Sequence, residues 1–174
     1  MRSQTPRGPT PGSAVIAGRP GRFAITMLRD ARIARLATAD AQGKPHVIPV
    51  CFAFDGHAIY SAIDEKPKRT SPRGLRRVRN IAANPRVALV VDHYEEDWRR
   101  LRYVLVQGRA TIVDGGPDHR RAIARLRDKY PQYRTMHLEG RPVLKISPSA
   151  IAAWEASRRR GSDGRKSAGP RRGR

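Results

Sequence analysis

Seven Lys and Arg side chains lie within fourteen residues near the middle of the chain, and no acidic residue interrupts them. Thr70 and Ser71 add hydroxyl donors to this segment, which follows a predicted strand and runs into a predicted helix. Cationic donors, hydroxyls and free backbone N–H groups at a helix N-terminus together suit a phosphate group. The alternative interpretation is a basic face exposed to water, as most runs of like charge are. The seven cations are Lys66, Lys68, Arg69, Arg73, Arg76, Arg77 and Arg79.

A second pattern, G-K-P-H-V-I-P-V over residues 43–50, places a proline inside a predicted strand. Pro49 cannot donate to a strand ladder, so the pattern predicts a sheet edge or a point where a ligand approaches. His46 begins this strand and is a candidate hydrogen-bond partner of that ligand. An edge proline with a surface histidine is the alternative. Trp98 lies in the charged segment 95–100, which offers no local core, and it is predicted to cover a pocket or a subunit interface.

Several catalytic and metal-binding motifs do not occur in the sequence. The five histidines are far apart, and HExxH, CxxC, G-x-S-x-G and P-loop patterns are absent, so the sequence predicts no metal site. The acidic residues show no pairing suited to acid–base chemistry, and no catalytic side chain is named. Cys51 is the single cysteine, which excludes an internal disulfide, and it is expected to be a buried thiol.

Hydrophobic periodicity and turn signals predict one mixed but mainly β domain. Adjacent strands joined by tight turns should pair antiparallel, and about six such strands favour closure into a barrel. Residues 87–91 are all apolar, which predicts a strand buried on both faces. Asp55-Gly56 predicts a hairpin turn and Gly108 a bulge. The expected strands are 33–39, 46–54, 57–63, 86–93, 102–113 and 142–147. The expected helices lie near 23–28, 75–82, 117–130 and 149–154.

The formal net charge of the 174 residues is +21, and half of it lies at the two ends. Residues 1–22 carry +4 and residues 157–174 carry +7, which leaves +10 for residues 23–156. Both ends are rich in Gly, Pro, Ser and Arg, so we expect disordered basic tails that contact nucleic acid at most without sequence preference. No apolar run approaches ~20 residues and no signal peptide is evident, so we expect no membrane contact and a cytoplasmic location.

Short motifs between about Met27 and Trp154 occur in a recognisable order: A-T-A-D (37–40), G-K-P-H (43–46), P-V (49–50), D-E-K-P-K (64–68), R-N-I (79–81), N-P-R-V (84–87), D-H-Y (92–94), Trp98 and V-Q-G-R-A (106–110). With these motifs the chain resembles the pyridoxamine-phosphate-oxidase-like superfamily of split-barrel flavoproteins. Within it, the chain is most similar to the actinobacterial branch that uses the deazaflavin coenzyme F420. The resemblance implies a split β-barrel, a six-stranded antiparallel Greek-key barrel with flanking helices.

The resemblance also implies a homodimer with a cofactor at the subunit interface, and it assigns residues to that cofactor. The phosphate side maps onto Lys66, Lys68, Arg77, Arg79 and Asn80. The ring side maps onto Ser61, Ala62 and Ile63, through backbone and small side chains, and onto His46 and Pro49. Trp98 corresponds to an aromatic residue that reaches the cofactor from the other subunit. Residues 64–77 are longer and more basic than in related members, which leaves the choice of phosphate ligands open.

Three functions follow from these observations. The first is an F420-dependent oxidoreductase that transfers a hydride to or from a small molecule. The second is an FMN-binding oxidase or reductase of the same fold; a strongly basic site favours the more anionic F420 over FMN. The third is a basic nucleic-acid-binding protein without enzymatic activity, although the sequence lacks the aromatic RNA-binding pattern and a recognition helix.

Overall fold

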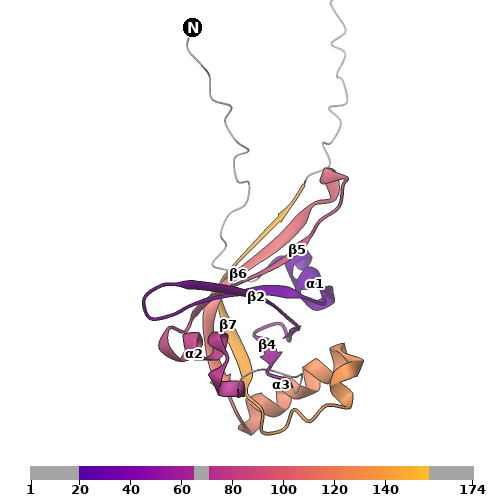
Figure 1. The fold of residues 1–174 in the computed structure, drawn as a ribbon. Helices are drawn as coiled ribbons and strands as arrows, with labels where there is room; N and C mark the ends of the chain where they lie inside the picture. The colour runs from indigo at the N-terminus through magenta and orange to yellow at the C-terminus, as the bar shows by residue number, and fades with distance from the viewer. Residues whose placement is uncertain (1–19, 65–70, 157–174) are drawn as a thin grey trace, which may run out of the picture.

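The computed structural model describes residues 20–64 and 71–156 of the chain. Figure 1 shows a strongly curved sheet with helices at its open sides, and with the long strands β5, β6 and β7 running from the body into a projecting arm. The predicted C-terminal tail and all but three residues of the predicted N-terminal tail lie outside the described residues.

Seven strands form one sheet in the order β2-β1-β5-β6-β7-β4-β3, and every neighbouring pair is antiparallel. The predicted fold class, a mainly β split barrel, is therefore confirmed. The strands are β1 (Ala34–Ala39), β2 (Pro45–Val50), β3 (Ala53–Phe54), β4 (Ile59–Ala62), β5 (Arg86–His93), β6 (Arg102–Val113) and β7 (Val143–Glu155).

The connection between β2 and β3 shows why this sheet must curl. The two strands lie at opposite ends of the strand order, yet only Cys51 and Phe52 separate them in the chain. Consecutive residues advance by at most ~3.6 Å, so Val50 and Ala53 lie within roughly 11 Å of each other. The two edge strands β2 and β3 are thus brought close together but do not pair with each other. This unpaired gap in the barrel is what the term split barrel describes.

Two hydrophobic clusters hold the sheet and its helices together. In the barrel interior, Leu28 of α1 (Arg22–Asp30) and Val78 of α2 (Arg76–Ala83) pack with Phe52 and strand residues. The second cluster lies between α3 (Gly116–Lys129) and the strands β3, β4 and β7, and Leu126 is fully buried there. Short 3-10 helices are η1 (Pro72–Gly74), η2 (Trp98–Arg100) and η3 (Pro131–Arg134). None of the described helices is long and apolar enough to cross a membrane.

One expected strand, residues 46–54, divides into β2 and β3, which raises the strand count from six to seven. Its β-branched and aromatic residues form one continuous pattern, but β2 pairs with β1 whereas β3 pairs with β4. At the break, the Phe52 N–H donates to the Tyr130 hydroxyl at 3.0 Å instead of to a strand. Cys51 lies at this break, where it is half-buried and packs against the second hydrophobic cluster, so the expectation of a buried thiol is met only in part.

The expected closing helix at 149–154 was also wrong, because β7 continues as a strand to Glu155. Its alanines favour a helix locally, but β6 extends twelve residues and offers a complete pairing edge. The strand at 86–93 is not buried on both faces: Val87, Leu89 and Val91 are buried, whereas the alternate residues Ala88 and Val90 are partly exposed. Tertiary pairing and one-sided burial therefore override the local pattern at both places.

Two predictions that rest on glycine residues, one of a turn and one of a bulge, are confirmed. Gly56 has a φ of 102° in the β3–β4 turn, and the Asp55 carboxylate accepts the backbone N–H groups of His57 and Ala58. Gly108 lies at the register shift between β6 and β7. A Cβ at Gly108 would come within 2.4 Å of the Ser147 carbonyl oxygen, so only glycine permits this close approach.

Candidate functional site

Three basic side chains come from the inner face of β2 and the first turn of α2. His46 is cross-strand partner of Thr38, whose buried side chain marks the inner face of β1. Arg76 and Arg77 lie about one helical turn before Asn80, whose side chain donates to the Thr38 hydroxyl beside His46. Burial and the positive charges of Arg76 and Arg77 lower the pKa of His46, which agrees with this arrangement. We call His46, Arg76 and Arg77 the α2 cation site. At neutral pH its histidine is neutral, so an anion there meets two guanidinium charges.

Arg77 is the member of this site with the strongest need for a partner. Its side chain is half-buried, and its Nε is fully enclosed with no hydrogen-bond partner among the described residues. Burial lowers the pKa of the guanidinium, while Asp64 and Tyr133 act in the opposite direction. A buried N–H without a partner is unusual in proteins and costs about 1–3 kcal/mol. An oxygen of a bound anion would satisfy this nitrogen and also lower the cost of the buried charge.

The other two predicted ligands on α2 point elsewhere. Residues two positions apart on a helix do not face the same side, and Arg79 is exposed. Asn80 is buried, and its Nδ2 donates to the Thr38 hydroxyl at 3.0 Å, which ties α2 to β1. The described part of the predicted phosphate segment therefore brings Arg77, rather than Arg79 or Asn80, into the α2 cation site. Arg73 forms an exposed ion pair with Asp114 at 2.6 Å.

The predicted ring-side residues occupy two different environments. Ser61, Ala62 and Ile63 are all buried at the end of β4, and the Ile63 N–H donates to the Pro142 carbonyl at 3.0 Å. Pro49 is exposed and lies three residues from His46, so the two side chains point to opposite faces of β2. β2 is an edge of the sheet, which confirms the edge interpretation of Pro49.

The remaining predicted site residues are Lys66, Lys68 and Trp98. Lys66 and Lys68 lie outside the described residues. Trp98 is 69% exposed and belongs to η2, at the tip of the arm and far from α2 (Figure 1). Tyr94 on the same turn is 64% exposed. Large apolar side chains at such a tip commonly mark a contact surface.

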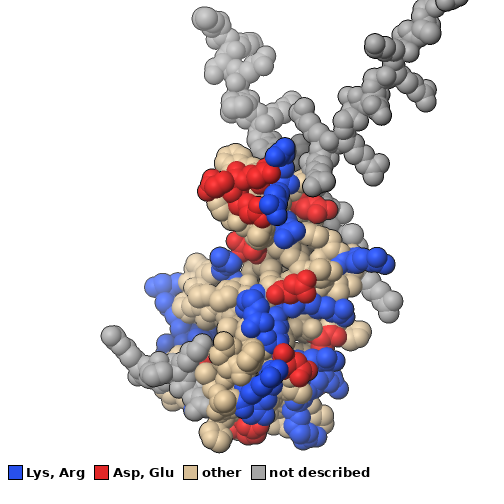
Figure 2. Space-filling view, turned by 90° about the vertical axis from the view of Figure 1, so that its right-hand side faces the viewer, with Lys and Arg blue, Asp and Glu red and all other residues tan. Residues whose placement is uncertain are grey.

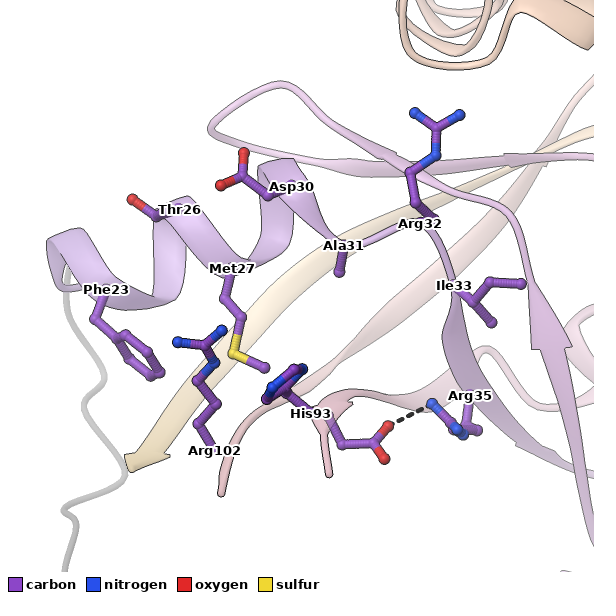
Figure 3. Close-up of a pocket in the computed structure, with 11 residues that line it drawn as sticks. Phe23, Thr26, Met27, Asp30, Ala31, Arg32, Ile33, Arg35, His93 and Arg102 are labelled. Atoms are coloured by element: carbon purple, nitrogen blue, oxygen red, sulfur yellow. Dashed lines mark hydrogen bonds and ion pairs between the residues drawn. The ribbon is translucent and has the colours of Figure 1, made fainter. Parts of the chain in front are cut away.

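A cavity of about 590 Å³ lies apart from the α2 cation site, between α1 and the strands β1, β5 and β6. Figure 3 shows Phe23 and Met27 reaching down from α1 toward His93 and Arg102, with Arg35 paired to Asp92 below them. The His93 ring also pairs with the Glu95 carboxylate at 2.5 Å. None of the predicted site residues lines this cavity, so it was missed from the sequence. Its residues come from three distant segments, which no local motif could reveal.

Charge is unevenly distributed over the described surface. Figure 2 shows acidic side chains gathered toward the end of the arm, where Glu95, Glu96 and Asp97 lie, and Lys and Arg side chains scattered over the body. The body therefore attracts anions over much of this face. Among the described residues, no group of three or more His, Cys, Asp or Glu side chains is placed to hold a metal ion.

The model of the pyridoxamine 5'-phosphate oxidase family matches residues 24–155. The chain belongs to this family. The match covers every described strand and helix except the first two residues of α1, so it agrees with the split barrel described above. The α2 cation site lies within the matched segment.

One relative in this family is a 5a,11a-dehydrotetracycline/5a,11a-dehydrooxytetracycline reductase from Streptomyces rimosus. It is 38% identical over 98 residues, which are 56% of this chain and 66% of the reductase. The similarity therefore covers just under two thirds of that enzyme.

Solved structures share the fold at lower identity. A conserved hypothetical protein from Mycobacterium tuberculosis superposes with a TM-score of 0.64 at 19% identity, over 82% of this chain and 87% of that one. A structure described as an F420 reductase has a TM-score of 0.53 at 25% identity, over 76% and 97%. A heme storage protein from Vibrio cholerae has a TM-score of 0.56 at 18% identity, over 72% and 87%.

Proposed function

We propose that this member of the pyridoxamine 5'-phosphate oxidase family is an F420-dependent oxidoreductase acting on a small molecule. The observation that carries the proposal is the buried Arg77 Nε without a hydrogen-bond partner among the described residues. The charges of Arg76 and Arg77 also lower the pKa of His46 on the neighbouring strand. Two comparisons support the reaction class: a relative is a reductase, and a structure with the same fold is an F420 reductase. The substrate, the cofactor and the cytoplasmic location remain predictions.

The α2 cation site would hold the phosphodiester of the cofactor. Arg77 would donate from its buried Nε, and Arg76 would supply a second charge from the exposed side of the same helix turn. Lys66 and Lys68, predicted from the sequence, would add cations from the segment before α2. Charge-assisted hydrogen bonds of this kind are about twice as strong as neutral ones, so a few are enough for specific binding.

His46 contributes a neutral ring to this site. Because its pKa is lowered, the ring donates one N–H and accepts at its other nitrogen near neutral pH. A bound anion would oppose the two arginine charges and raise the pKa of His46 again. Proton uptake by His46 should therefore accompany binding, and binding should strengthen as the pH falls through the range in which His46 titrates.

The cofactor would supply the redox chemistry, which is hydride transfer, while the protein positions it and excludes water. This division of labour agrees with the sequence, in which no acid–base pair is recognisable. The predicted preference for F420 over FMN rests on charge: F420 carries a phosphodiester and glutamate carboxylates, and the segment 66–79 carries seven cations. FMN, with a single phosphate, is the competing ligand.

We also propose that the active form is a homodimer. In one chain the α2 cation site is open, since Arg76 is exposed and His46 is only half-buried. The arm carries its exposed Trp98 and Tyr94 far from the α2 cation site of its own chain. An arm that reaches across to a second copy would bury these aromatic side chains and cover that copy's ligand.

The experiment compares F420 binding by wild type, Arg77→Gln and Arg79→Gln at two salt concentrations. The Arg77→Gln variant loses one charge-assisted hydrogen bond, so its affinity for F420 should be roughly tenfold to a hundredfold lower than that of wild type at both salt concentrations. Arg79→Gln removes the same charge from an exposed position of the same helix and should change binding little. Equal and small losses that disappear in high salt would instead indicate a solvated basic face.

A further inference from the structure

A second cavity lies on the outer face of the sheet, on the side away from the barrel core. Its volume is about 550 Å³, and it spans β1, the start of β2, β5, β6 and the middle of β7. Ala37 and Ala88 are cross-strand partners with partly exposed side chains, and Ala39 lies two residues further along the same face of β1. The floor is therefore made largely of small alanine side chains. It differs from the α2 cation site, because α2 packs against Thr38 on the inner face.

Two arginines stand directly opposite each other at the rim of this cavity. Arg86 on β5 and Arg109 on β6 are cross-strand partners, and both are exposed. Like charges in this arrangement repel and destabilise a sheet. Neither guanidinium forms an ion pair or a side-chain hydrogen bond with another described residue. By contrast, Arg127 pairs with Glu139 at 2.8 Å. The repulsion between Arg86 and Arg109 thus has no counter-ion within the described chain.

We propose that this outer cavity binds a planar anionic ligand, with a carboxylate or phosphate held between Arg86 and Arg109 and an apolar ring lying on the alanine floor. Two guanidinium forks at one rim can bind an anion bidentately. The small alanine side chains leave room for an apolar ring to lie against the sheet. Gln107 and Ser149 add polar groups along the same wall. The proposal does not depend on the cofactor proposed above.

The test uses full-length protein and two probes, 1-naphthoate and its uncharged analogue naphthalene-1-carboxamide. Calorimetric titration should show binding of the carboxylate and at least about tenfold weaker binding of the amide. The double variant Arg86→Gln/Arg109→Gln should lose about tenfold or more in naphthoate affinity. Arg120→Gln removes an exposed charge from α3, outside the cavity, and should bind as wild type does. Arg77→Gln should also keep naphthoate binding, which separates this test from that of the α2 cation site.

Thermal unfolding gives a second and independent readout. Without ligand, Arg86→Gln or Arg109→Gln should raise the melting temperature, because each removes the repulsion. Equal binding of the two probes, or lower melting temperatures for both single variants, would overturn the proposal. Sedimentation of the double variant distinguishes a further case. If the double substitution converts a dimer to a monomer, and naphthoate does not bind the wild-type protein, a second copy of the chain occupies the outer cavity. The proposal is then wrong.

Discussion

Replacing Arg77 by methionine should stabilise the protein in the absence of cofactor, although it should weaken cofactor binding. The methionine side chain would keep most of the length and the apolar stem of the arginine, so packing beside α2 should be preserved. The substitution removes an enclosed Nε that has no partner among the described residues. Such a group costs about 1–3 kcal/mol. It also removes the attraction to Asp64, which at a half-exposed site is worth about 0–1 kcal/mol.

The expected net change is a gain of about 1 kcal/mol in the free energy of unfolding, or about 2–4 °C in melting temperature for a chain of this size. Urea unfolding of protein stripped of small molecules measures it, with Arg79→Met as the matched control. The control removes an exposed charge from the same helix and should change stability by no more than about 0.5 kcal/mol. If Arg77→Met lowers the free energy of unfolding by about 1 kcal/mol while Arg79→Met has no effect, the guanidinium stabilises the free protein. The buried Arg77 side chain would then not destabilise the free protein, and its burial would be no evidence for a bound anion.

Two further predictions concern the link between the barrel and α3. Tyr130→Phe should lower the free energy of unfolding by about 1–3 kcal/mol in urea titrations, because it leaves the buried Phe52 N–H without its acceptor at 3.0 Å; a loss below about 0.5 kcal/mol would contradict this role of the hydroxyl. Burial lowers the pKa of Lys129 to about 8, below its value of 10.5 in an unfolded chain. Between these values the unfolded chain binds more protons, so stability should rise with pH from about 8 to about 10.5. Lys129→Met should remove that part of the rise in pH-dependent unfolding, and an unchanged slope in the variant would show that other groups cause it.

The fold could be predicted from the sequence wherever local signals and tertiary pairing agree. β5 and β6 have the predicted bounds, because Asn84-Pro85 precedes the first, a Gly-Gly turn follows the second, and the charged segment 95–100 separates them. The prediction failed at residues 46–54 and 149–154. At both places the local residue pattern does not show which strand the segment pairs with, and that pairing decides the structure. Phe52 is aromatic like its strand neighbours, yet it crosses the split between two sheet edges. The alanines of β7 favour a helix, yet β6 supplies an edge with which they pair.

The candidate site could be predicted only in part, for a similar reason. The charge run directs attention to the start of α2, because its composition can be seen without coordinates. Which cation faces a ligand depends on helix phase and burial, and these distinguish Arg77 from Arg79. Asn80 belongs to the family pattern, but its side chain is hydrogen-bonded to Thr38. This contact joins two segments that are distant in the sequence. The arginine pair at Arg86 and Arg109 depends on strand register, which single-sequence patterns do not specify.

The central claim is that the chain holds F420 at the α2 cation site in preference to FMN. The most direct measurement is a titration of the purified wild-type protein with each cofactor under identical conditions, with Arg77→Gln in parallel. We expect one F420 bound per chain, weaker binding of FMN, and a loss of F420 affinity in the variant. Protein that purifies yellow with one FMN per chain, and from which F420 does not displace the flavin, would contradict the claim.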